Sequence, residues 1–266
     1  MKIPAERWLD AIYQRHSRRQ FNGKQLSGET IHHLENFTHE LNKHLPGARV
    51  AFISADPDPV FKGLIGGYGR IKGAPAYAAF LGLMSDPHVQ EKVGYLGECF
   101  ILEATASGLA TCWIGGTFRP EMVTTHLKIE KEEAVLAVTP VGYVPGNYSF
   151  TEKTLSGMAR SRKRKPLEEL LVTGSGCHFP EWIKVSVEAA RVAPSAVNRQ
   201  PWRFVVEDQG ITVRVDNLKN SSGISKRLDC GIAMLHIEIG ALVSGVKGQW
   251  NFLESPDVAR YNILTE

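Results

Sequence analysis

The sequence predicts an α+β fold made of two tandem, related halves that pack together as an intramolecular pseudo-dimer. Two observations support this prediction. The order helix, strand, strand, long apolar helix occurs twice along the 266 residues, and the two long apolar segments align without a gap. The halves meet in the basic stretch SGMARSRKRKPLEELL, so we place them at residues 1–165 and 166–266. A chain of this length can bury a substantial core.

The long apolar segments carry the clearest internal similarity. GYLGECFILEATASGLATCW begins at Gly94, and GIAMLHIEIGALVSGVKGQW begins at Gly231. Both have apolar residues at helical spacing, and the Gly108–Trp113 spacing equals the Gly245–Trp250 spacing. Similarity between two apolar helices often arises by chance, so the argument for duplication depends on the other elements occurring in the same order.

Those elements are helices and strands that precede each long segment. Helical patterns occur in GETIHHLENFTHELN and FPEWIKVSVEAARVA, and strand patterns follow in RVAFISAD and PWRFVVED, then in APAYAAFLGL and ITVRVDNL. The two copies are unequal. Only the first has RHSRRQF and the IGG that follows Trp113, and only the second has APSAVNRQPW. We therefore expect the halves to complement each other rather than to repeat one function.

Composition excludes several classes of protein. A net charge of +3 is too small to indicate a nucleic-acid or membrane partner. The first residues are charged throughout, unlike a signal peptide, and no apolar run approaches the roughly 18 residues of a membrane span. We expect a cytoplasmic protein. The four cysteines form no CxxC pair, which argues against zinc, and we expect buried thiols: Cys99, Cys112, Cys177 and Cys230.

Two basic segments are candidate anion sites. RHSRRQF, from Arg15 to Phe21, supplies three arginines and a serine, which can surround a phosphate. A second cluster precedes Pro166 and consists of Arg160, Arg162, Lys163, Arg164 and Lys165. Because these cations repel one another, they require either solvent or an anion. From the residues alone, a solvated surface and a shared phosphate site both remain open.

The segment APSAVNRQPW, from Ala193 to Trp202, is the most informative. It lies where a helix gives way to a strand, and its Pro, Ser and Asn residues favour a turn. Such a turn offers Ser195, Asn198 and Gln200 to a flat heteroaromatic ring, and Pro194 adds an apolar surface.

Together these segments resemble the flavin-dependent nitroreductases of bacteria. That family has Arg-Arg-Ser-x-Arg-x-Phe near its start, where this chain has RHSRRQF, and Ala-Pro-Ser-x-x-Asn-x-Gln-Pro-Trp, present here without exception. The family's Gly-Leu-Gly-x-x-Trp-x-Gly resembles Gly108 to Gly115, and its later Gly-Tyr-Pro and Arg-x-Pro segments resemble Gly142-Tyr143 and Arg164-Lys165-Pro166. The resemblance covers almost the whole chain.

The resemblance implies a nitroreductase-like fold and an FMN site. In the family, two subunits build each site across their interface, whereas here the Arg-Ser segment and the Pro-Ser-x-x-Asn turn fall in different halves. One chain would therefore hold one FMN and stay monomeric, with the mirror-image site lost. The implied FMN-binding residues are Arg15, His16, Ser17, Arg19, Ile114, Gly115, Gly116, Arg162, Arg164, Pro194, Ser195, Ala196, Asn198 and Gln200. No catalytic acid or base and no metal ligand is expected.

The expected activity is hydride transfer from NAD(P)H through FMN to a nitroaromatic, quinone or similar small oxidised acceptor, in a ping-pong sequence. A non-catalytic flavin-binding or sensing protein, another reaction on the same scaffold, and a structural protein without flavin are the alternatives. The Gly-rich segment Gly63–Gly73 is either a rim that places Tyr68 over the site or a plain connection.

Overall fold

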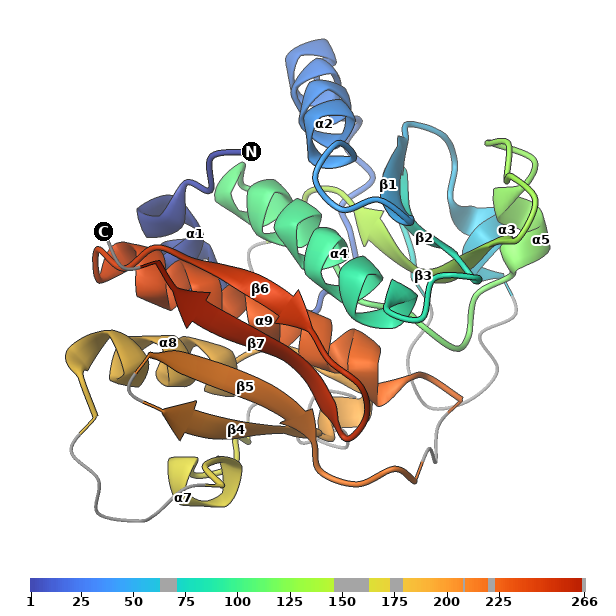
Figure 1. The fold of residues 1–266 in the computed structure, drawn as a ribbon. Coiled ribbons are helices and arrows are strands. Elements are labelled where there is room, and N and C mark those ends of the chain that lie inside the picture. Colours follow the sequence, from blue (N-terminus) through green and yellow to red (C-terminus); the bar gives the residue numbers. More distant parts are fainter. Residues whose placement is uncertain (63–70, 146–162, 173–178, 208, 220–222, 265–266) are drawn as a thin grey trace.

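The computed structural model describes residues 1–266 except 63–70, 146–162, 173–178, 208, 220–222 and 265–266 (Figure 1). At its centre, helices α4 (Val89–Ala106) and α9 (Lys226–Val243) pack against each other. An antiparallel sheet of order β1-β2-β3 lies on the α4 side, with strands Ala48–Ile53, Ala76–Leu83 and Glu133–Val141. An antiparallel sheet of order β4-β5-β7-β6 lies on the α9 side, with strands Trp202–Glu207, Gly210–Val215, Asp257–Ile263 and Gly248–Phe252.

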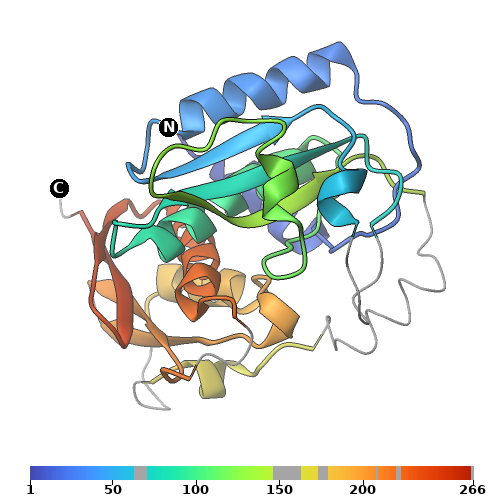
Figure 2. The same ribbon diagram turned by 90° about the vertical axis from the view of Figure 1, so that its right-hand side faces the viewer.

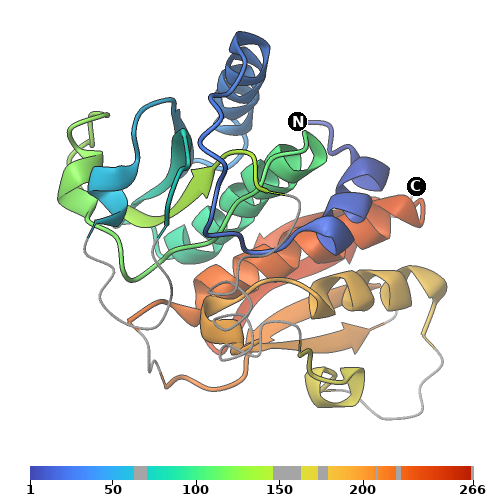
Figure 3. The same ribbon diagram turned by 180° about the vertical axis from the view of Figure 1, so that it is seen from behind.

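Further helices cover the outer faces of these central elements. Helix α1 (Ala5–Gln14) packs on both α9 and α4, and α8 (Glu181–Arg191) packs along α9 (Figure 3). Helix α2 (Gly28–Leu41) lies over β1, at the end of the molecule farthest from the four-stranded sheet (Figure 2). Four short helical segments complete the described elements: α3 (Asp58–Phe61), α5 (Pro120–Val123), α7 (Leu167–Leu170) and the 3₁₀ turn η1 (Ala196–Asn198).

The burial of the strands follows from these layers. Strand β2 is buried along almost its whole length because α4 packs on one face and a second apolar cluster, which includes Phe61 and Val123, packs on the other. Its sequence is accordingly a nearly continuous apolar run. Strand β4 alternates buried and half-buried residues, as expected for a strand with one face on the core.

The crossing of α4 and α9 depends on one glycine from each helix. A Cβ placed on Gly94 would lie 2.0 Å from the carbonyl oxygen of Leu228, and one on Gly231 would lie 2.0 Å from that of Glu91. Each glycine therefore rests directly on the backbone of the opposite helix. These are the same two glycines at which the apolar segments align in the sequence.

The predicted α+β fold, with mainly antiparallel sheets and packed central helices, is confirmed. The described elements also occur in the predicted order: α2, β1, β2, α4 and then α8, β4, β5, α9. In the part of the chain that the structure describes, no helix is both long and apolar enough to cross a membrane. Cys99, Cys112 and Cys230 are buried free thiols, and Cys177 lies outside the described residues.

Candidate functional site

The arginine-rich segment follows directly from the end of α1. Arg15 caps the helix in an extended conformation, and its amide N–H donates to the carbonyl of Ala11. Ser17 then forms a parallel bridge with Thr111, and the amide of Arg18 donates to the Thr111 carbonyl at 2.9 Å. The segment is therefore fixed beside the chain that leaves α4. His16 is exposed, whereas Ser17 is half-buried.

Arg15 and Arg164 bring a buried and a half-buried cation near each other from distant parts of the sequence. Arg15 is 9% exposed, and its Nε is buried without a hydrogen-bond partner in the described residues. Burial and, to a smaller extent, the positive charges of Arg15 and Arg191 lower the pKa of Arg164 to about 10. A buried cation is costly unless an opposite charge accompanies it. The local chemistry therefore fits an anion beside Arg15.

The segment from Ala193 to Trp202 forms the predicted turn. It contains η1, and three non-glycine residues have left-handed backbones, with φ of 47° at Val197, 55° at Asn198 and 48° at Gln200. Such conformations are uncommon outside glycine and persist where the surroundings impose them.

The polar side chains of this turn bind within the protein. Ser195 Oγ accepts from the Gln200 amide at 2.9 Å, and Gln200 Oε1 accepts from the Lys165 amide at 2.8 Å. Asn198 Oδ1 accepts from Arg164 at 3.1 Å. The side-chain amides of Asn198 and Gln200, which the sequence predicted to face a ring, thus join the turn to the basic segment around Arg164. Pro194 is buried, and Ser195, Ala196 and Asn198 are half-buried.

The segment after Trp113 approaches the start of α9. Ile114 is buried and exchanges two backbone hydrogen bonds with Val138 of β3, at 2.9 and 2.8 Å. A Cβ on Gly115 would lie 3.2 Å from Ile224 Cδ1, and one on Gly116 would lie 3.4 Å from the same atom. Larger side chains at these glycines would press on Ile224, just ahead of α9.

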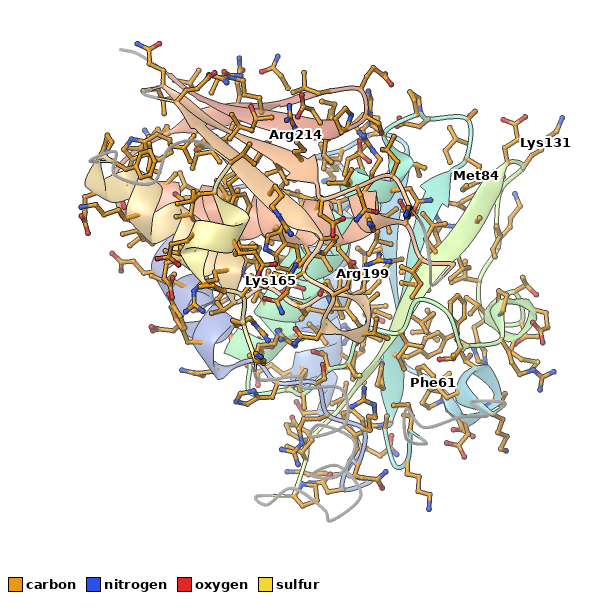
Figure 4. The ribbon with its side chains drawn as sticks, turned by 90° about the horizontal axis from the view of Figure 1, so that it is seen from below. Phe61, Met84, Lys131, Lys165, Arg199 and Arg214 are labelled. Atoms are coloured by element: carbon orange, nitrogen blue, oxygen red, sulfur yellow. The ribbon has the colours of Figure 1, made fainter. Side chains whose placement is uncertain are left out.

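Asp229 and Arg199 belong to the site, and the sequence analysis missed both. Asp229 lies in the first turn of α9, where Oδ1 accepts from the Ala196 amide at 3.0 Å and Oδ2 accepts from Arg199 Nε at 2.6 Å. Burial raises the pKa of Asp229 to about 6, against the opposing effect of Arg199. In the sequence, the position of Asp229 at the start of the apolar run DCGIAMLHI was the feature that could have indicated a buried carboxylate. Figure 4 labels Arg199 and Lys165 near the middle of the view, and the Lys165 amide donates to Gln200, the residue that follows Arg199.

The structure thus brings most predicted residues into one region. A hydrogen bond links Arg164 with Asn198, and Ile224 packs against Gly115. Arg15 is near enough to Arg164 for its charge to lower the Arg164 pKa. Arg19 lies beside Lys72, whose amide donates to the Arg19 carbonyl at 3.0 Å. Arg162 and Tyr68 lie outside the described residues, as does most of the Gly-rich segment.

Comparison with known proteins gives the family. The family described as "Putative TM nitroreductase" matches residues 8–241. The chain belongs to this nitroreductase family. Membership gives it a general oxidoreductase role. None of the curated proteins searched matches the chain.

One solved structure supports the fold, and two others are more distantly similar. A "putative nitroreductase" from Thermotoga maritima is 19% identical, with a TM-score of 0.62, over 96% of this chain and 93% of that one. A structure described as an oxidoreductase containing FMN is 18% identical, with a TM-score of 0.47, over 64% of this chain and 92% of that one. An FMN-dependent nitroreductase from Clostridium difficile is 15% identical, with a TM-score of 0.42, over 52% and 88%. At these identities the similarity concerns the fold alone.

Proposed function

We propose that this nitroreductase-family chain binds one FMN and is an NAD(P)H-dependent oxidoreductase. When bound, the flavin would accept a hydride from the nicotinamide and pass electrons to a small oxidised acceptor such as a nitroaromatic or a quinone. The protein would bind and orient the cofactor, and no side chain is assigned as an acid or base. Residues 1–165 and 166–266 would be the two related halves whose seam holds the site.

The observation that carries this proposal is the neighbouring pair of arginines, Arg15, which is buried, and Arg164, which is half-buried. The two side chains come from the two segments that, by resemblance, surround the flavin phosphate. Among the described residues, the buried Nε of Arg15 has no hydrogen-bond partner. Burial lowers the pKa of Arg164, and the positive charge of Arg15 adds to this effect. A phosphate would accept a hydrogen bond from Arg15 Nε, because guanidinium groups form strong charge-assisted hydrogen bonds to phosphate oxygens. Its negative charge would also offset the repulsion between Arg15 and Arg164.

The remaining residues would contact the rest of the cofactor. Ser17 and Arg19 follow Arg15 along the phosphate side, with His16 contributing its backbone and Arg162 completing the phosphate clamp. Gly115 and Gly116 would allow the close approach of a ring to the backbone, since glycine carries no Cβ. Ile114 would add an apolar contact beside them. The turn that includes Pro194, Ser195, Ala196, Asn198 and Gln200 would lie against the isoalloxazine from the other side.

Flavin content per chain tests the binding proposal. The purified protein is mixed with FMN and desalted, and bound flavin is quantified from its visible spectrum. We expect about one FMN per chain. Two would show that the mirror-image site also binds, and none would overturn the flavin proposal.

Arg15→Gln tests the phosphate assignment, with riboflavin as the probe that lacks a phosphate. Loss of one charge-assisted hydrogen-bonding partner, worth about 1.5–3 kcal/mol, should weaken FMN binding about 10- to 150-fold and change riboflavin binding little. The matched control is Arg214→Gln, since Arg214 pairs with Asp257 within the four-stranded sheet. Equal losses for FMN and riboflavin in Arg15→Gln would contradict a phosphate contact.

Turnover separates an enzyme from a flavin sensor. The flavin-loaded protein should oxidise NADH or NADPH under air, and faster with menadione or nitrofurazone. Bound flavin without turnover for any of these acceptors would refute the catalytic half of the proposal.

A further inference from the structure

We infer that Asp229 is a positioning residue for the flavin-binding turn: its carboxylate holds residues 196–199 in the geometry that accepts the cofactor. The inference rests on the proposed function. It assigns a role to a residue outside the segments that carry the family resemblance.

Both oxygens of the Asp229 carboxylate are used by the same turn. Oδ1 accepts from the Ala196 amide at the start of η1, and Oδ2 accepts from Arg199 at its end. The side chain of Asp229 is only 2% exposed, so water does not compete for these bonds. One buried group on α9 therefore fixes the two ends of a four-residue stretch.

Arg199 extends this clamp to the segment that faces Gly115. Its NH2 donates to the carbonyls of Ile224 at 3.0 Å and Ser225 at 2.9 Å. The side chain of Ile224 lies against Gly115. Asp229 therefore orients an arginine that joins the turn to the other proposed flavin contact.

The turn needs such support because its backbone is unfavourable. Val197 and Asn198 both have positive φ within the clamped stretch, and the β-branched Val197 fits the left-handed region poorly. Without the clamp, the stretch would relax toward ordinary backbone geometry. Asn198 would then move away from Arg164, which it contacts at 3.1 Å. The phosphate side and the ring side of the proposed site are coupled through that contact.

The internal alignment shows that this arrangement is specific to one half. Asp229 lies two residues before Gly231, and Lys92 lies two residues before the matching Gly94. Lys92 donates to Asp86 at 2.5 Å and to the Pro46 carbonyl at 3.2 Å. The matching position in the first half thus carries a positive charge instead of a negative one. The first half also lacks the sequence of the flavin-binding turn.

The test compares Asp229→Asn with Glu91→Gln. Glu91 is a matched control because it is also a buried carboxylate in the first turn of a central helix and also pairs with an arginine, Arg227. We expect Asp229→Asn to weaken FMN binding at pH 7.5 about tenfold or more, the scale of a lost charged hydrogen bond. Glu91→Gln should leave FMN binding within about twofold even though it also removes a buried pair, which costs stability.

A pH series supplies a measurement that a general loss of stability would not reproduce. Arg199 on the turn is the charged group that faces the Asp229 carboxylate, and the neighbouring Cys230 thiol on α9 feels the charge of Asp229. Arg227 on α9 and Glu91 on α4 act on that thiol from further along. Protonation of Asp229, whose pKa is about 6, removes the partner of Arg199. The wild-type dissociation constant for FMN should therefore rise as the pH falls from 7.5 to 5. That rise should be smaller in Asp229→Asn.

The outcomes are distinguishable. If the wild type binds FMN and Asp229→Asn binds it equally well, or if Glu91→Gln loses as much affinity, the positioning role is overturned and the proposed function stands. If the wild type binds no flavin, both are overturned. Should Asp229→Asn fail to fold, Arg199→Lys keeps the charge but loses the bonds to Ile224 and Ser225. It should weaken FMN binding about threefold, the scale of a lost neutral hydrogen bond, and unchanged binding would overturn the inference.

Discussion

The closest contact between the central helices predicts a large effect from adding one methyl group. Gly231 lies on α9 where a Cβ would be 2.0 Å from the carbonyl oxygen of Glu91 and 2.7 Å from its carbon. A carbon touches a carbonyl oxygen at about 3.3 Å. Gly231→Ala must therefore separate the helix backbones by about 1.3 Å at the crossing, because no flexible side chain is there to give way.

The two energetic effects of this substitution oppose each other. Alanine favours a helix over glycine by about 0.5–1 kcal/mol. Overpacking of a tight core costs about 1–3 kcal/mol, and the upper end applies here because the obstructing atoms are backbone. The net loss in unfolding free energy is about 2 kcal/mol. For a domain of this size, such a loss lowers the melting temperature by roughly 4–8 °C.

Thermal unfolding followed by circular dichroism measures the effect. The control is Gly28→Ala, at the first residue of α2, where a Cβ would meet nothing within 4 Å. We expect Gly28→Ala to melt within about 2 °C of the wild type, because an exposed alanine at a helix end changes little. Equal melting temperatures for Gly231→Ala and Gly28→Ala would show that α4 and α9 do not cross in backbone contact.

Two further predictions concern stability. Val197→Asn should raise the unfolding free energy by about 0.5–1 kcal/mol, because asparagine tolerates a left-handed backbone better than valine does. The Val197 side chain is half exposed, so its loss costs little packing. Chemical denaturation of the flavin-free protein measures the change, and a loss of stability would argue against the left-handed backbone at this residue. Burial favours a raised pKa at Glu103, but hydrogen bonds from Arg7, Trp8 and His33 lower it below 4.5. The stabilisation from ionised Glu103 is therefore present above pH 4.5 and is lost as the pH falls through its lowered pKa. At pH 7, Glu103→Gln should have an unfolding free energy about 1–2 kcal/mol below that of the wild type. This difference should shrink below pH 4.5, and a difference that stays constant from pH 7 to 3 would contradict the prediction.

The central helices and sheets could be predicted from the sequence because burial leaves a periodic pattern. The segment GETIHHLENFTHELN contains all of α2, and the apolar run from Gly94 falls on α4. Strand β2 is a continuous apolar run because both of its faces are covered. The place where α4 and α9 cross was also visible in the sequence, as the pair of glycines at which the segments align, although the contact itself was not.

The interior of the candidate site could not be predicted in the same way. Asp229 contacts Ala196, which lies 33 residues earlier in the sequence, and no local sequence pattern indicates a contact over such a separation. The roles of Asn198 and Gln200 are also set by the tertiary fold. Both side chains could equally have faced a ligand, and their bonds to the segment around Arg164 became apparent only once the two segments lay side by side.

The polar side chains of the turn also support the basic segment around Arg164. Gln200 accepts from Lys165, and Asn198 accepts from Arg164, so the turn fixes the basic segment as well as itself. Like charges at Arg15 and Arg164 would drive an unsupported basic segment toward solvent. The turn opposes this through hydrogen bonds to neutral amides, which hold the guanidinium of Arg164 in place without neutralising its charge. A carboxylate at Asn198 would neutralise Arg164 and compete with any bound anion. Because the side-chain amides of the turn are neutral, they hold Arg164 in place and leave its positive charge available to attract an anion. The polar residues of the turn therefore fit a phosphate site better than a structural ion pair.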